Sequence, residues 1–331
     1  MQIQHNPVDS RETRFSQVEL LASDDVDEFA ELHRPAWDLC YEQMSAGSFS
    51  AEKVIRRSES AVAYRERYGR TVRAQGAPAP GSFVVAAVNR GRSKGRWWGR
   101  SFPQSALVTI SDTSWADLIL PEDCDDIVVA FDKERLRETV GILTGTEPLW
   151  MDSESHFLEM AQPHCDRVAA EWIRLIEGPS PMDSGTLFDR LLQPLASALP
   201  QRAQSVKSPS TRAALVRRAV EMSDAASGRK SISQICLELR VSQRALNYAF
   251  RSQVGEPPVR YLRMRRMNQV RRKLRVAEPG ETAISAIAAD LGFYEAGRFS
   301  VEYRKLFGES PSTTLRRPVP RGRARFVARQ A

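Results

Sequence analysis

The chain has 331 residues, of which 42% are hydrophobic and 27% charged, and this length is enough for two domains with separate cores. Its net charge of +7 is divided unevenly: residues 201–331 carry 27 Lys and Arg against 10 Asp and Glu, whereas residues 1–200 carry 21 against 31. This asymmetry predicts a basic half that binds a polyanion and an acidic half with another role. No apolar run approaches the roughly 18 residues that span a bilayer, and the four cysteines form no CxxC pair. We therefore expect no membrane contact, reduced thiols and a cytoplasmic location.

Short apolar or alternating runs, separated by turn residues, dominate residues 15–131. Runs at this spacing predict an antiparallel β-sandwich or barrel. One short acidic helix, from Asp24 to Leu32, is expected among them, with Ser23 as its cap. The expected strands are Phe15–Leu21, Trp37–Met44, Phe49–Ile55, Ala61–Tyr68, Ser82–Val88, Ala106–Ile110, Trp115–Leu120 and Ile127–Phe131.

Helical patterns follow from residue 132. Proline is expected to interrupt two of these helices, at Pro163 and Pro194, because it lacks the backbone N–H. The expected helices are 132–143, 154–176 and 184–199. The polar, unpatterned residues 201–208 predict a linker. The expected divisions are a first domain at 1–200, the linker at 201–208, a second domain at 209–317 and a disordered basic tail at 318–331.

One short pattern occurs twice within residues 231–311. Ile235-Cys-Leu-Glu-Leu-Arg-Val241 aligns with Ile287-Ala-Ala-Asp-Leu-Gly-Phe293, and each copy later reaches a glycine, Gly255 or Gly308. Each copy predicts a short helix, a tight turn and a second helix, which is the layout of a helix-turn-helix whose second helix enters the DNA major groove. The expected helices of this half are 209–226, 232–239, 243–254, 258–276, 283–291 and 295–307.

The helix expected at 258–276 joins the two copies and is rich in arginine. Its apolar stripe is expected to contain Val259, Leu262, Met267, Val270 and Leu274. Its basic residues are expected to be solvated, with some reaching phosphates; they are Arg260, Arg263, Arg265, Arg266, Arg271, Arg272, Lys273 and Arg275. Two helix-turn-helix motifs joined in this way resemble the DNA-binding domain of the AraC/XylS family of transcription factors. The resemblance implies that recognition helices 243–254 and 295–307 enter successive major grooves, about 34 Å apart.

The outward side chains of the first recognition helix include the types that read base edges. Arginine offers two donors to guanine, and asparagine or glutamine offers a donor and an acceptor to adenine. The expected base contacts are Gln243, Arg244 and Asn247 in the first copy, and Arg298 and Ser300 in the second. The expected phosphate contacts are Tyr248, Arg251, Arg304 and Lys305. The start of the second recognition helix offers few side chains that could read bases beyond Glu295. The first copy is therefore expected to supply more of the discrimination between DNA sequences.

The turn of the first copy contains Arg240, where this type of turn usually has glycine. Either the arginine adopts an unfavourable backbone conformation or the turn differs. Neither alternative changes the predicted fold.

The N-terminal half resembles the cupin-like effector and dimerisation region of AraC-type regulators. Within that group, residues 37–46, 76–81 and 95–99 look loosely like regulators of the ethanolamine-operon type. Aromatic residues of this half are candidates to line an effector pocket, although such residues more often form the core; they are Phe83, Trp97, Trp98, Phe102 and Trp115. The β-region from Trp37 onward contains none of the four histidines, and His33 lies just before it, so we expect no metal, no cofactor and no catalytic residues.

The expected fold class is therefore α+β, with an antiparallel β domain plus helices followed by an all-α domain. The expected function is sequence-specific regulation of transcription through double-stranded DNA. RNA polymerase, a small-molecule effector and a second copy of the chain, bound through the N-terminal domain, are candidate partners. Two alternatives remain open: a non-specific architectural DNA binder, and an enzyme that its basic half tethers to nucleic acid. The sequence leaves the operator and the choice between activation and repression open.

Overall fold

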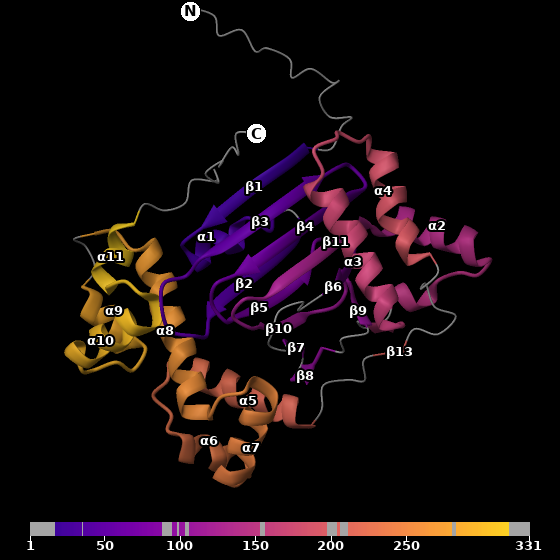
Figure 1. Cartoon of the computed structure of the whole chain (residues 1–331). Coiled ribbons are helices and arrows are strands. Elements are labelled where there is room, and N and C mark those ends of the chain that lie inside the picture. The colour runs from indigo at the N-terminus through magenta and orange to yellow at the C-terminus, as the bar shows by residue number, and fades with distance from the viewer. Residues whose placement is uncertain are drawn as a thin grey trace, which may run out of the picture.

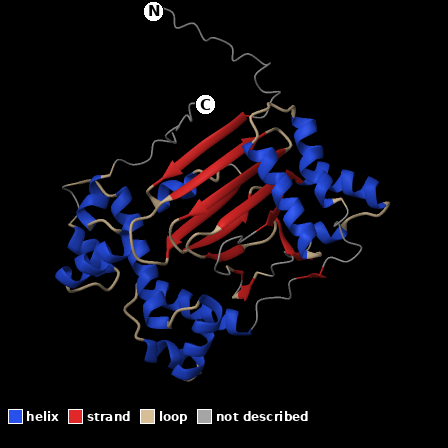
Figure 2. Cartoon of the chain, viewed as in Figure 1, coloured by secondary structure: helices blue, strands red, loops and turns tan. Residues whose placement is uncertain are grey.

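The computed structural model describes residues 17–34, 36–87, 95–97, 99–102, 106–152, 156–196, 204–205, 211–279 and 283–317. A β-rich N-terminal domain is followed by a helical C-terminal domain (Figure 1; Figure 2). The expected α+β class is confirmed. Trp98 and the tail expected at 318–331 lie outside the described residues, as does most of the linker expected at 201–208.

The N-terminal domain contains two antiparallel sheets. The larger has the order β1-β3-β4-β11-β6-β9-β12-β13, and its strands are Gln17–Ser23, Ala51–Arg57, Ala61–Tyr68, Asp125–Asp132, Ser82–Ala87, Ala106–Ser111, His156–Glu159 and Gln204–Ser205 in that order. The smaller has the order β2-β5-β10-β7-β8, with strands Trp37–Gln43, Val72–Pro78, Ala116–Leu120, Arg96–Trp97 and Arg100–Ser101.

Each face of the larger sheet packs against a different layer, because successive side chains of a strand point to opposite faces. Val84 and Val128 belong to a core shared with the smaller sheet, whereas their neighbours Val85 and Val129 belong to a core shared with the helices. Figure 1 shows α3 and α4 lying across that second face. The helices of this domain are α1 Val26–Glu31, α2 Lys133–Thr144, α3 Gln162–Glu177 and α4 Ser184–Leu192, with short 3-10 turns at Leu149–Asp152 and Gln193–Leu195.

Four local predictions for this domain are wrong. Residues 156–159 form strand β12 instead of the start of a helix, and Pro163 lies in the first turn of α3, where a missing N–H costs nothing. Strand β5 was missed because Arg73, Gln75 and Gly76 break its apolar alternation. The cap of α1 is Asp25, whose side chain accepts from the N–H groups of residues 27 and 28. The expected break at Pro194 is confirmed by the 3-10 turn there.

The C-terminal domain consists of helices around one core that includes Val216, Leu246, Tyr261 and Tyr303. Its helices are α5 Thr211–Ala225, α6 Ile232–Leu239, α7 Gln243–Val254, α8 Pro258–Val276, α9 Ile284–Asp290, α10 Ala296–Phe307 and α11 Pro311–Arg316. Helices α6 and α7 form the first helix-turn-helix, and α9 and α10 form the second, as predicted. The expected capping box of Ser231 and Gln234 is present at the start of α6, and Ser242 caps α7.

Arg240 adopts the left-handed conformation, with φ 55° and ψ 42°, which is the first of the two alternatives for this turn. A residue with a Cβ pays about 1–2 kcal/mol in that region, and the entropy cost of glycine is about 0.5–1 kcal/mol. We expect Arg240→Gly to raise the free energy of unfolding by about 0.5–1 kcal/mol, measured by thermal unfolding of the full chain.

The matched control for this change is Gly255→Ala at the end of α7. Gly255 also has a positive φ, 80°, and no atom lies within 4 Å of a Cβ placed there, so that the substitution adds backbone strain without a clash. It should lower the melting temperature. A lower melting temperature for Arg240→Gly would instead show that the arginine side chain contributes more than its backbone conformation costs.

Candidate DNA-binding interface

Helix α7 presents polar side chains at its N-terminal end. Leu246, Ala249 and Phe250 are buried, which leaves Gln243 and Arg244 exposed on the opposite side. Because Ser242 caps the helix with a hydrogen bond to the N–H of residue 245, this first turn is regular. An exposed, regular first turn is the part of a recognition helix that approaches base edges.

Two of the predicted base-contact residues of α7, Gln243 and Asn247, make hydrogen bonds within the protein. Gln243 Nε2 donates to Ser233 Oγ at 3.0 Å, and Asn247 Nδ2 donates to the Gln243 carbonyl at 3.0 Å. Asn247 is half-buried, whereas Arg244, Tyr248 and Arg251 are exposed. The ring of Tyr248 lies under the guanidinium of Arg212 from α5 at 4.7 Å. The structure thus groups these side chains on one surface, where Gln243 and Arg244 are both exposed.

Helix α10 presents a weaker set. Arg298 and Ser300 are exposed, as are the predicted phosphate contacts Arg304 and Lys305. Arg298 Nε donates to Glu302 Oε1 at 2.9 Å, and the Ser300 hydroxyl donates to the carbonyl of residue 296. In this structure both predicted base contacts therefore bind groups of their own helix.

Glu302 is shared between α10 and α8. Its other carboxylate oxygen accepts from Arg263 Nε at 2.5 Å. Burial raises the pKa of Glu302, but its hydrogen bonds to Arg263 and Arg298 outweigh that effect and lower the pKa below its ordinary value. The charged carboxylate therefore holds Arg298 along the helix axis.

The linker helix α8 departs from its prediction as a solvated basic helix. Arg265, Arg271 and Arg275 are buried, while Val259, expected in the apolar stripe, is 61% exposed. Arg265 donates to Glu42 of the N-terminal domain at 2.8 Å and to Asp224 of α5 at 2.9 Å. Much of the positive charge of α8 is thus paired inside the protein.

Arg271 forms the centre of a second group of ion pairs. It donates to Asp25 at 2.7 Å, to Asp27 at 3.1 Å and to Glu309 at 2.5 Å. Two of these carboxylates belong to the N-terminal domain and the third follows α10. The acidic half of the chain therefore partly neutralises the basic half, which the charge totals alone did not indicate.

The described aromatic residues that were predicted to line an effector pocket lie in separate places. Phe83 packs edge-on against Trp150 on the helix side of the larger sheet, whereas Trp97 and Phe102 pack around Phe157 between the two sheets. Trp115 is 56% exposed. These residues come from different strands and loops, so nearness in the sequence did not bring them to one place.

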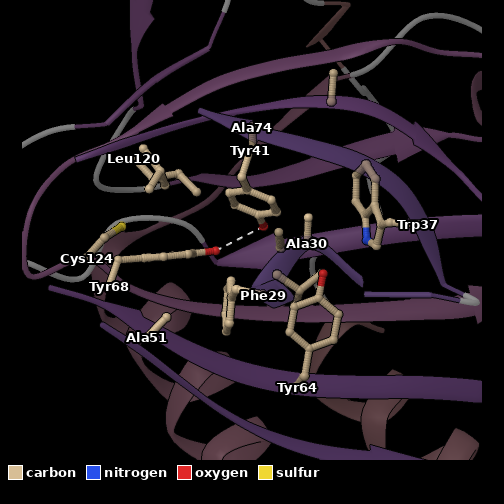
Figure 3. Close-up of a cluster of buried hydrophobic side chains, with 14 of the residues drawn as sticks. Phe29, Ala30, Trp37, Tyr41, Ala51, Tyr64, Tyr68, Ala74, Leu120 and Cys124 are labelled. Atoms are coloured by element: carbon tan, nitrogen blue, oxygen red, sulfur yellow. Dashed lines mark hydrogen bonds between the residues drawn. The ribbon is translucent and has the colours of Figure 1, made fainter. Parts of the chain in front are cut away.

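The space between the sheets instead holds aromatic side chains around buried charges. Figure 3 shows Phe29, Tyr41, Tyr64 and Tyr68 together, with a hydrogen bond between the hydroxyls of Tyr41 and Tyr68. Three charged or titratable side chains also meet here: His33 Nε2 lies 2.7 Å and Lys53 Nζ 3.5 Å from Glu66 Oε2. No sequence pattern singled out these three residues, because each lies alone in a different element.

Burial lowers the pKa of Lys53 to about 7, against an ordinary value of 10.5. Burial also lowers the pKa of His33.

Within the part of the chain that the structure describes, no group of three or more His, Cys, Asp and Glu side chains is arranged to hold a metal ion. None of the described helices is long and apolar enough to cross a membrane.

Comparison with known proteins identifies relatives of this chain. Residues 235–317 match a family model described as a helix-turn-helix domain. The chain is 31% identical over 164 residues to a probable thc operon regulatory protein of Rhodococcus erythropolis, a match that covers 45% of this chain and 49% of that protein. It is 25% identical over 268 residues to a XylDLEGF operon transcriptional activator of Pseudomonas putida, covering 76% of this chain and 78% of the relative.

Among solved structures, the AraC-like transcriptional activator CuxR is 16% identical, with a TM-score of 0.39 and coverage of 77% of this chain and 94% of that one. The helix-turn-helix match agrees with the two motifs seen on either side of α8, and the relatives are regulators of operons. The chain is a DNA-binding transcription regulator whose sequence is similar to regulators of the AraC/XylS family.

Proposed function

We propose that this regulator reads two successive major grooves with α7 and α10, and that α7 supplies most of the sequence discrimination. The observation that supports this most strongly is the exposed first turn of α7, which carries Gln243 and Arg244 beside Asn247. Helix α10 offers Arg298, whose guanidinium must leave Glu302 or share it in order to contact a base. The unequal sets favour one strong and one weak half-site.

In this proposal, Tyr248, Arg251, Arg304 and Lys305 contact phosphates. All four are exposed, and contacts to phosphate and sugar make up half to two-thirds of protein–DNA hydrogen bonds. They set orientation and affinity without reading sequence.

The proposed role of the protein is activation, since its relatives in Pseudomonas putida are named as activators.

Arg244→Ala is expected to relax the preference at one base pair and to weaken binding to the preferred site by about 1–3 kcal/mol, roughly 5- to 150-fold. The reason is that arginine donates two hydrogen bonds to guanine, which alanine cannot replace. Selection of duplexes from a random library by the full chain gives the wild-type site, and the same selection with the variant gives the altered preference.

The control is Arg251→Ala, on the same helix. It should weaken binding to all duplexes alike and reduce the dependence of affinity on salt, because it removes a phosphate contact. An equal loss for Arg244→Ala on random and selected duplexes would reject its role in reading bases. A selection that returns no consensus for the wild type would favour the architectural alternative.

We further propose that the N-terminal domain detects a small molecule through the charged residues between its sheets. A buried cluster of Lys53, Glu66 and His33 contributes less to stability than an apolar core would, so its presence supports a role other than packing. Dimerisation through this domain, contact with RNA polymerase and a cytoplasmic, non-catalytic role complete the proposal. Native mass spectrometry of the full chain tests small-molecule binding, which would appear as a retained ligand, and dimerisation, which would appear as a doubled mass.

A further inference from the structure

The N-terminal domain donates hydrogen bonds to the C-terminal end of each recognition helix. At the end of α7, Arg96 Nη1 donates to the carbonyl of Ser252 at 2.5 Å. At the end of α10, Gln43 Nε2 donates to the carbonyl of Leu306 at 2.6 Å, and the N–H of Gly47 lies 3.0 Å from the carbonyl of Lys305. The last four carbonyls of a helix lack partners within the helix, so the other domain supplies donors that the helices themselves cannot.

These donors are anchored to one sheet. Gln43 ends strand β2 and Arg96 begins strand β7, and both strands belong to the five-stranded sheet with the order β2-β5-β10-β7-β8. Neighbouring strands lie about 4.8 Å apart, so three strand spacings separate the two anchors by roughly 14 Å. A hydrogen-bonded sheet is stiff over that distance, so the sheet keeps the separation of Gln43 and Arg96 constant.

The same sheet also holds the helix between the motifs. The backbone of Gln43 makes two hydrogen bonds with the Asn268 side chain of α8, each 2.9 Å long. Both groups are buried. Figure 1 shows α8 passing along the end of β2. Each recognition helix and the helix that joins them are thus attached to one rigid element.

The two domains approach each other closely at both helix ends. A Cβ added to Gly308, directly after α10, would lie 2.7 Å from the backbone nitrogen of Ser48. A Cβ added to Gly99, beside β7, would lie 2.8 Å from the Cα of Gln253 in α7. A side chain at either glycine would therefore collide with the backbone of the other domain.

We propose that the five-stranded sheet sets the distance and angle between the two recognition helices, with Gln43 and Arg96 as positioning residues. The N-terminal domain then determines which spacing of the two half-sites the protein accepts. This inference rests on the proposed reading of DNA by both α7 and α10. It gives the sheet a role in specificity although the sheet touches no base.

The test measures binding of the full chain to its selected duplex after one or two base pairs are added to or removed from the segment between the half-sites. Each added or removed base pair changes the distance between the half-sites by about 3.4 Å and their relative rotation about the DNA axis by roughly 34°. The wild type is expected to lose affinity about tenfold for a change of one base pair, because one helix then loses its contacts. In Arg96→Met and in Gln43→Met, this penalty should fall below about threefold.

Two comparisons separate positioning from stability. Arg96→Lys keeps a donor for the Ser252 carbonyl and should restore the spacing preference, and Arg100→Met, at an exposed arginine of β8, should leave it unchanged. Affinity for a duplex with only the first half-site should not change in any variant. If Gln43→Met does not fold, the half-exposed Arg96 decides the result alone.

A wild-type spacing penalty that persists in folded Arg96→Met would overturn the inference. Uniform weakening at all spacings would overturn it as well, since that would assign these residues to stability only. A wild type that selects a consensus but tolerates every spacing would reject the inference and leave the proposed function intact. A wild type that selects no consensus would reject the proposed function itself.

Discussion

Arg271→Ala is expected to lower the free energy of unfolding of the chain by about 3–5 kcal/mol, because removal of one partner leaves buried charges uncompensated. The guanidinium is 4% exposed, and it pairs with Asp25, Asp27 and Glu309. It also lies over the ring of Phe307 at the end of α10, 5.1 Å from its centre. Alanine would leave three carboxylates close together without their central cation.

Arg271→Ala should lower the midpoint of unfolding in urea and should also weaken the coupling between the unfolding of the two domains. Every tryptophan precedes residue 173, so fluorescence reports unfolding of the N-terminal domain, whereas circular dichroism also follows the helices of the C-terminal domain. In urea, the two signals should separate further in Arg271→Ala than in the wild type, which is the sign of lost cooperativity.

The control is Arg260→Ala on the same helix, whose side chain is 65% exposed and lies 3.5 Å from Glu256. An exposed pair four residues apart on a helix contributes about 0.5 kcal/mol or less. An equal loss of unfolding free energy in both variants would indicate that replacing any arginine of α8 destabilises the helix, whether or not that arginine is buried. A loss below about 1 kcal/mol for Arg271→Ala would show that the domains do not depend on this cluster.

Glu66→Leu is expected to destabilise the N-terminal domain by about 3–5 kcal/mol. Glu66 lies between the two sheets, 4% exposed, beside His33 and Lys53, and it accepts a hydrogen bond from the hydroxyl of Tyr68. Leucine is similar in volume, but it leaves Lys53 without a carboxylate and removes the acceptor that His33 and Tyr68 share. The unfolding midpoint in urea, followed by tryptophan fluorescence, measures the loss.

The pH dependence of stability offers an independent check. Burial alone would raise the pKa of Glu66, but the neighbouring His33 and Lys53 lower it to about 2, against an ordinary value of 4.5. A carboxyl with a lowered pKa stabilises the folded state fully above the unfolded value and loses that contribution as the pH falls toward the folded value. The wild type should therefore lose stability between pH 4.5 and 2 more steeply than Glu66→Leu.

Glu52→Leu is the matched control, on the neighbouring strand β3, where the side chain is exposed. Surface substitutions of this kind change stability by about 0.5 kcal/mol or less. If Glu66→Leu were as stable as this control, the residues between the sheets would pack equally well without the charge. That outcome would remove the argument for a small molecule bound at this place.

Local patterns determined the C-terminal domain. Helix periodicity, the capping box at Ser231 and the cap at Ser242 depend on residues within one or two turns of each other, and the predicted helices 232–239 and 243–254 agree with α6 and α7. The outward position of Arg244 follows from the same periodicity. The left-handed conformation of Arg240 was one of two alternatives that the sequence allowed.

Contacts between distant segments were not determined by local patterns. Arg271 and Arg260 are indistinguishable in the sequence, yet one is buried against Asp25 and the other is exposed. The burial of a charge depends on a partner that lies more than two hundred residues away, and no periodicity encodes that distance. For the same reason, the aromatic residues chosen for a pocket lie in two separate cores.

The sequence by itself therefore determined that the protein has two helix-turn-helix motifs, and which side chains face outward on the first of them. Only the tertiary structure decided what the basic helix between the motifs does: it pairs with the acidic domain through Arg265 and Arg271. The physical reason is that helices form from contacts a few residues apart, whereas an interface between domains forms from charges and donors brought together by the whole fold.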